Sequence, residues 1–158
     1  MSTLAIISAI LFANYLILMA KFHGVQPSVS DNYYVSKHPW TFTLAMWTVA
    51  FMMLPPMLSA TTETFQSTAF LSCAGIAFVG AAAAYKQSMT NTVHTIGAVI
   101  AALFAIIWAY TICPPLPTIA ILAAVNILLS KVSNKIYWIE LIAFIVTYLT
   151  YFVSLIIN

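Results

Sequence analysis

The chain has 158 residues, which is enough for one domain. Its apolar fraction of 63% and charged fraction of 5% exclude a soluble globular domain, which carries about 25% charged residues, because such a chain would expose large apolar patches to water. The net charge of +2, with no arginine and no basic cluster, excludes nucleic acid as a partner.

Six apolar segments follow one another along the chain. A helix needs about 20 mostly apolar residues to cross a bilayer, and the segments that reach or approach this length are residues 3–20, 39–58, 68–85, 93–112, 116–129 and 136–157. The fifth is the shortest, and we expect it to be a tilted or partial span. The sequence therefore predicts an all-α fold: a polytopic integral membrane protein whose residues 1–158 form a single transmembrane domain, a six-helix bundle.

The positions of the lysines predict the orientation of this bundle. With six spans the loops alternate between the two sides of the membrane, and every lysine falls in the first, third or fifth loop: Lys21, Lys37, Lys86, Lys131 and Lys135. Because lysine is enriched on the cytoplasmic side of membrane proteins, we expect these loops in the cytoplasm and both termini outside. The predicted location is the cell membrane.

Small residues predict where two helices approach closely. Gly80 and Ala84 in the third segment are four residues apart, as are Gly97 and Ala101 in the fourth. Small residues at this spacing let helix backbones approach each other in lipid. We therefore expect these two segments to form a tight antiparallel hairpin.

Three side chains near the predicted outer face carry further expectations. Trp108 lies near the outer end of the fourth segment, where an aromatic ring typically anchors a span at the membrane interface. Cys73 and Cys113 lie in apolar surroundings and belong to no metal-binding or redox motif, so we expect buried free thiols and leave a disulfide between them open.

Polar side chains interrupt the apolar segments at similar depths from the lysine side. They are Asn14, His94, Asn126 and Glu140. Polar groups inside hydrocarbon are costly and tend to face the bundle interior or a wet cavity. The sequence therefore predicts a polar site near one end of the bundle.

Glu140 also heads a polar stripe on the last segment. Residues at spacings of 7, 4 and 3 share one face of a helix, and here they are Glu140, Thr147, Tyr151 and Ser154. We expect this face to point inward. Glu140 is then either a structural carboxylate paired with Lys135 or a tyrosine hydroxyl, or a functional group, and the sequence leaves both roles open.

The first loop, residues 23–34, is the most polar stretch of the chain and is long enough to reach the same site. The candidate ligand-binding residues are His94, Asp31, Glu140, Asn14, Asn126 and Ser30. We expect Asp31, His94 and Glu140 to converge on one cytoplasm-facing pocket, with the two asparagines on its floor.

The sequence does not single out a reaction. No HxxxH or HExxH spacing is present, so we expect no metal site. A hydrolytic arrangement of Ser28 or Ser30 with a histidine and a carboxylate is chemically feasible, although no nucleophile-elbow signature accompanies it. A proton relay between a histidine and a carboxylate is as feasible as the hydrolytic arrangement. No motif indicates a haem, nucleotide or phosphate site, so no cofactor is expected, and whether the protein is an enzyme stays open.

Two short motifs carry a resemblance to a known family. They are Pro27-Ser28-Val29-Ser30-Asp31 and His94-Thr95-Ile96-Gly97-Ala98, the latter in a segment that Tyr110 closes. They resemble the Ser-Asp loop and the His-x-x-Gly-Ala span of the Frag1/DRAM/Sfk1 group, six-span membrane proteins linked to lipid and GPI-anchor handling. The resemblance implies a lipid-facing role for Asp31 and His94.

Three functions agree with these observations. The first is binding of a membrane lipid or a small molecule at the polar pocket, with or without catalysis. The second is a small transporter or channel subunit, acting as a homo- or hetero-oligomer within the membrane. The third is an accessory or assembly subunit whose polar residues only fix helix packing.

Overall fold

The computed structural model describes residues 1–82 and 88–157, and nothing is described of the side chains of residues 88–91. Within these residues every regular element is a helix, which confirms the predicted all-α class. The elements are α1 (Ser2–His23), α2 (Asn32–Val35), α3 (Trp40–Ser59), the 3-10 helix η1 (Glu63–Phe65), α4 (Gln66–Ala82), α5 (Ser88–Ile112), α6 (Pro115–Leu129) and α7 (Lys135–Ile157).

Among the described residues, five stretches of helix are long and apolar enough to cross a membrane. They are Ser2–His23, Trp40–Ser59, Glu63–Ala82, Thr92–Ile112 and Lys135–Ile157. The fifth predicted span is α6, which has 15 residues and therefore extends about 22 Å, short of the roughly 30 Å of a hydrocarbon core. The predicted end of the third span at residues 83–85 lies outside the described residues.

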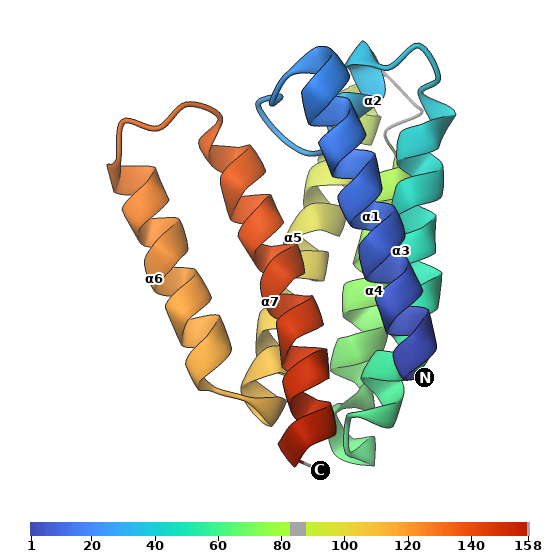
Figure 1. Ribbon diagram of the computed structural model, residues 1–158, viewed down its shortest axis with the longest axis vertical. Coiled ribbons are helices and arrows are strands. Elements are labelled where there is room, and N and C mark those ends of the chain that lie inside the picture. The colour runs from blue at the N-terminus through green and yellow to red at the C-terminus, as the bar shows by residue number, and fades with distance from the viewer. Residues whose placement is uncertain (83–87, 158) are drawn as a thin grey trace.

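The helices form a ring in which α1, α3, α4, α5 and α7 follow one another. Helices that are adjacent in this order pack extensively, whereas α7 and α1, which close the ring, meet at few points. Helix α6 packs against α7 outside the ring. Figure 1 shows α6 and α7 as a hairpin at one edge of the bundle. The interior between α7 and the other four helices is therefore the least tightly closed part of the fold.

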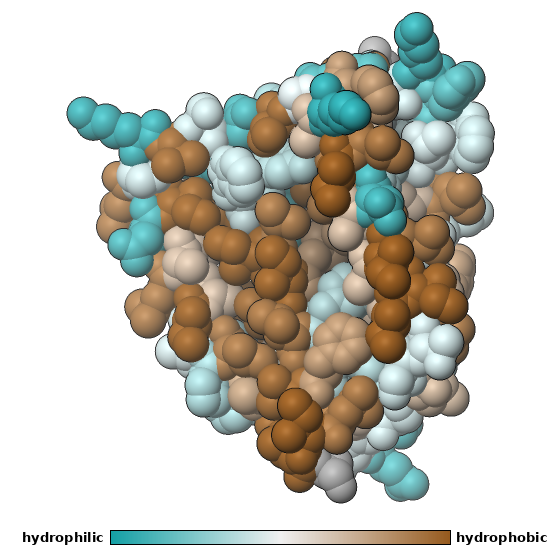
Figure 2. Space-filling view, viewed as in Figure 1, coloured by the Kyte–Doolittle hydropathy of each residue, from teal (hydrophilic) through white to brown (hydrophobic). Residues whose placement is uncertain are grey.

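The described lysines lie together at one end of the bundle. Both termini lie at one end, and the loops after α1 and between α6 and α7 lie at the other (Figure 1). Of the five lysines, Lys21, Lys37, Lys131 and Lys135 belong to this second end, and Lys86 lies outside the described residues. Figure 2 shows hydrophilic side chains gathered mainly at the ends and hydrophobic ones across the middle.

The predicted hairpin is present, but its contact residues differ from the prediction. The α4–α5 contact is the most extensive in the molecule, and a Cβ added to Gly75 would lie 2.7 Å from the Gly97 oxygen and 2.6 Å from the Ala101 nitrogen. Gly80 was expected in this contact and instead faces α3, where its Cβ would lie 2.8 Å from that of Met46. The reason is that Gly75 and Gly80 are five residues apart, so they point in different directions on α4. Ala84 lies outside the described residues.

Trp108 is not an interface anchor. Its side chain is 0% exposed, and its indole Nε1 donates a hydrogen bond to Thr61 Oγ1 at 2.6 Å. The tryptophan thus ties α5 to the chain between α3 and η1, and that prediction is wrong. Cys73, which is buried, and Cys113, which is half-buried, are both free thiols.

Candidate functional site

A cavity of about 140 Å³ lies inside the ring, between α3, α4, α5, α7 and the loop that follows α1. Its walls are mostly apolar. The described residues of α5 that line the cavity are all alanines, namely Ala98, Ala101, Ala102 and Ala105. The size is close to that of an apolar cavity of about 150 Å³ that takes up benzene in another protein, so a small ring system fits as the cavity stands, and a long alkyl chain fits when flexible side chains on the wall move aside.

Helix α3 forms the long wall of the cavity. Its lining residues are Phe42, Met46, Val49, Met53 and Met57. Their spacings of 4, 3, 4 and 4 place them on one helical face, and from the first to the last they cover about 22 Å of helix. Methionine side chains are flexible and polarizable, so this wall can adapt to an apolar ligand. The spacing is visible in the sequence but is not accompanied by a polar contrast that would have drawn attention to it.

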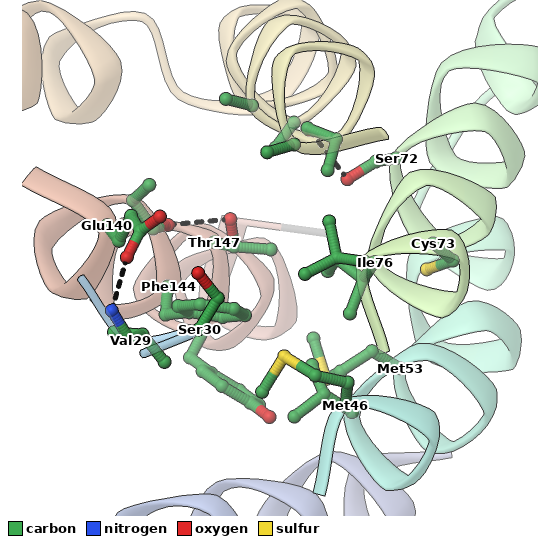
Figure 3. Close-up of a pocket in the computed structure, with 18 of the residues that line it drawn as sticks. Val29, Ser30, Met46, Met53, Ser72, Cys73, Ile76, Glu140, Phe144 and Thr147 are labelled. Carbon is green, nitrogen blue, oxygen red and sulfur yellow. Dashed lines mark hydrogen bonds between the residues drawn. The ribbon is translucent and has the colours of Figure 1, made fainter. Parts of the chain in front are cut away.

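Glu140 and Ser30 form a polar end to this apolar space. The Val29 backbone N–H donates to Glu140 Oε2 at 2.6 Å, and both Glu140 and Ser30 line the cavity. Figure 3 shows Glu140 and Ser30 on one side of the cavity, with Met46 and Met53 across from them. Val29 is 3% exposed, so its burial fixes the first loop against α7 and holds the carboxylate at the cavity wall.

Asp31 connects the other predicted residues to this end. Its carboxylate Oδ2 accepts a hydrogen bond from Ser28 Oγ at 2.8 Å, and Ser28 Oγ lies 2.9 Å from Ser30 Oγ. Asp31 is near enough to interact electrostatically with both Glu140 and His94. Of the predicted candidates, Ser30 and Glu140 therefore line the cavity, while Asp31 lies beside this end without lining the cavity.

His94 lies behind this cluster rather than on the cavity wall. It is half-buried on α5, close to the Val79 backbone of α4, and it is not among the residues that line the cavity. Within the described part of the chain, its buried Nδ1 has no hydrogen-bond partner. His94 therefore does not line the cavity, and its electrostatic interaction with Asp31 connects it to the Glu140 end.

The two asparagines do not line the floor of the pocket, so that prediction is wrong. Both side chains are exposed. Each amide nitrogen donates to the carbonyl one turn earlier on its own helix, Asn14 to Ile10 at 2.9 Å and Asn126 to Leu122 at 2.8 Å. The sequence indicates how far along its helix each asparagine lies, but not the direction in which its side chain points.

The remaining polar groups on the wall are already engaged. Ser72 Oγ donates to the Ala101 carbonyl at 3.2 Å, and Thr147 Oγ1 donates to the Ala143 carbonyl at 2.8 Å. The hydroxyl of Tyr148 is hydrogen-bonded to that of Ser8 on α1 at 2.7 Å. Beyond the Glu140 end, these side chains therefore present mainly carbon atoms to the cavity.

The expected stripe on α7 does point inward. Glu140 and Thr147 line the cavity, while Tyr151 and Ser154 are 1% and 2% exposed. The alternative pairing of Glu140 with Lys135 is wrong, because Lys135 Nζ instead donates to the Leu128 carbonyl at 2.7 Å.

Asn32 was not among the predicted site residues. Its side chain is 1% exposed, and neither amide atom has a partner among the described residues. It follows Asp31 at the start of α2, in the loop whose polarity was noted, so its position was visible while its burial was not.

The described residues limit the chemistry of this end. Among them, no three histidine, cysteine, aspartate or glutamate side chains gather closely enough to hold a metal ion. The chain matches no family model, no curated protein and no solved structure. What this site can do therefore follows from its shape, an apolar space with one carboxylate end.

Proposed function

We propose that this protein is a multi-span membrane protein that binds one single-chain amphipathic molecule, a lipid or a small molecule, inside its helix ring. The head group lies at Glu140 and Ser30. The alkyl chain of the ligand runs along the methionine face of α3, which consists of Met46, Met53 and Met57. The observation that carries this proposal is the distribution of polar groups on the cavity wall. Glu140 keeps an oxygen beyond the one that Val29 occupies, whereas the hydroxyls deeper in the cavity are bonded to carbonyls or to each other.

The membrane setting rests on the five long apolar helices and on the lysines. The described lysines share the end of the bundle opposite both termini, and lysine is enriched on the cytoplasmic side. The polar end of the cavity, with Glu140 near the start of α7, then faces the cytoplasm. A lipid role also agrees with the resemblance of the first loop and of the segment beginning at His94 to the Frag1/DRAM/Sfk1 group.

Access from the bilayer is expected at the seam between α1 and α7. These helices meet through the Ser8–Tyr148 hydrogen bond and the Phe12 and Phe144 rings, whose centroids are 4.5 Å apart. Figure 2 shows a hollow on this face between the two helices. Because few other contacts close the seam, an alkyl chain can enter from the side.

Native mass spectrometry of the purified protein in maltoside micelles tests the binding. The probes are tetradecylamine, tetradecanol and myristate, which share one alkyl chain length. We expect at least one to bind in a single copy. Leu in place of Ala143, on the cavity wall, fills the space and should weaken binding about tenfold or more, the loss expected when roughly 1.4 kcal/mol of apolar contact is removed.

The matched control is Ala13→Leu, which adds the same side chain at an exposed position of α1. Ala105→Leu fills the cavity from α5 and guards against a folding defect peculiar to Ala143→Leu. Binding that persists unchanged in both cavity-filling variants would show that the amphiphile occupies another place and would refute the proposal.

Cysteine labelling in intact cells tests the orientation of the protein in the membrane. In a background without Cys73 and Cys113, a cysteine at Ser133 should be protected from a membrane-impermeant thiol reagent in intact cells, and a cysteine at Thr62 should be labelled. Both positions are exposed. Ser133 lies between α6 and α7 and Thr62 between α3 and η1, so they belong to loops at opposite ends of the bundle. The reverse labelling pattern would overturn the assignment of the lysine end to the cytoplasm.

A further inference from the structure

We infer that the head group bound at Glu140 is a protonated amine, so that the ligand class is cationic single-chain amphiphiles. This inference rests on the proposed function and names the chemistry that the same site selects. It follows from the charge on the cavity wall, from the unused capacity of one carboxylate and from the composition of the chain.

The ionisable side chains near the polar end are acidic. Glu140 lines the cavity and Asp31 lies within electrostatic range of it. Among the described residues that line the cavity there is no lysine or histidine, and the chain contains no arginine. Lys135, one turn before Glu140, is occupied with the Leu128 carbonyl at 2.7 Å. A carboxylate or phosphate head group would therefore meet two acidic side chains and, among the described residues that line the cavity, no cationic one.

The hydrogen-bonding capacity of Glu140 points to a donor. One of its oxygens accepts the Val29 N–H, and a carboxylate has about four acceptor positions on its two oxygens. An ammonium group brings three donors and no acceptor. It can donate to Glu140 and to the Ser30 hydroxyl on the same wall, which satisfies the carboxylate with charge-assisted hydrogen bonds.

An uncharged alcohol of the same chain length gives a weaker interaction. Hydrogen bonds to charged groups contribute more than neutral ones, and the difference corresponds to about tenfold in affinity or more. The apolar part of the cavity makes the same contacts with the alkyl chains of the amine and of the alcohol. The preference for the amine over the alcohol therefore isolates what the head-group end contributes.

The experiment measures dissociation constants for tetradecylamine, tetradecanol and myristate by native mass spectrometry of wild type and two variants. In wild type we expect the amine to bind tightest and myristate weakest. In Glu140→Gln the amine should lose about tenfold or more, while the alcohol changes by less than about threefold. The glutamine amide oxygen can still accept the Val29 N–H, so unchanged alcohol binding also shows that the cavity is intact.

The control is Glu63→Gln, which removes the same charge from an exposed side chain of η1, at the other end of the bundle. It should leave all three affinities unchanged, and a loss of amine binding equal to that of Glu140→Gln would overturn the inference. If the amphiphiles bind in the cavity without preference for the amine, or if Glu140→Gln keeps that preference, the inference is wrong while the proposed function stands. If none binds, both fall.

Discussion

Substituting Ala for Gly75 tests the packing that forms the ring. The added Cβ would lie 2.6 Å from the Ala101 nitrogen, 2.9 Å from its Cα and 2.7 Å from the Gly97 oxygen, whereas ordinary contact begins at 3.4 Å. All three are backbone atoms, so no side-chain rotation can relieve the clash, and α5 itself must move away from α4.

The magnitude follows from two opposing effects. Overpacking of this kind costs about 1–3 kcal/mol, while replacing a helical glycine by alanine contributes about 1 kcal/mol of helix propensity. With backbone on every side, we place the clash at the upper end of its range and expect Gly75→Ala to lose about 2 kcal/mol. Gly97→Ala should be near neutral, because its Cβ would meet the Gly75 oxygen and Phe78 Cβ at 3.3 Å, where a few tenths of an ångström suffice.

Thermal unfolding in maltoside micelles, followed by tryptophan fluorescence, gives the comparison. At about 2–4 °C per kcal/mol for a chain of this size, Gly75→Ala should melt roughly 4–8 °C below wild type, and Gly97→Ala within about 2 °C of it. A Gly75→Ala protein that melts at or above Gly97→Ala would refute the close backbone approach.

Two further predictions concern single contacts. Ser8→Ala and Tyr148→Phe, which each remove one hydroxyl of the bond between α1 and α7, should show a coupling of about 1 kcal/mol in a double-mutant cycle of unfolding free energies; strict additivity would mean that the bond does not form. A maleimide reagent should modify Cys113, which is half-buried, well before Cys73, which is 3% exposed, as measured by mass spectrometry of folded protein; equal rates would place both thiols at the surface.

The positions of the helices could be predicted from the sequence because the long helices coincide with apolar runs of about the length that crosses a bilayer. The inward direction of the polar stripe on α7 could also be predicted, but the directions of the side chains on α1 and α4 could not. In a soluble helix a polar face marks the outside, but α1 and α4 are apolar on most sides, so the sequence did not indicate which way Asn14 and Gly80 point. Their actual directions depend on which neighbour each helix packs against.

For the site, too, some features could be predicted from the sequence and others could not. That Asp31 and Glu140 lie at one end followed from loop length and from depth along α7. The partner of Glu140 did not, because the Val29 N–H is a backbone group whose position depends on how the first loop folds back. The methionine face of α3 could be identified as a cavity wall only from the structure, in which α4, α5 and α7 surround the same space.

A crystal structure of the protein with ω-bromotetradecylamine, phased on bromine anomalous scattering, tests the central claim most directly. We expect the bromine peak inside the ring near Met57 and Tyr148, at the apolar end of the cavity, and the amine within hydrogen-bonding distance of Glu140. Bromine density confined to the outer surface of the helices, or lying beside Glu140 with the amine at the far end, would contradict the account.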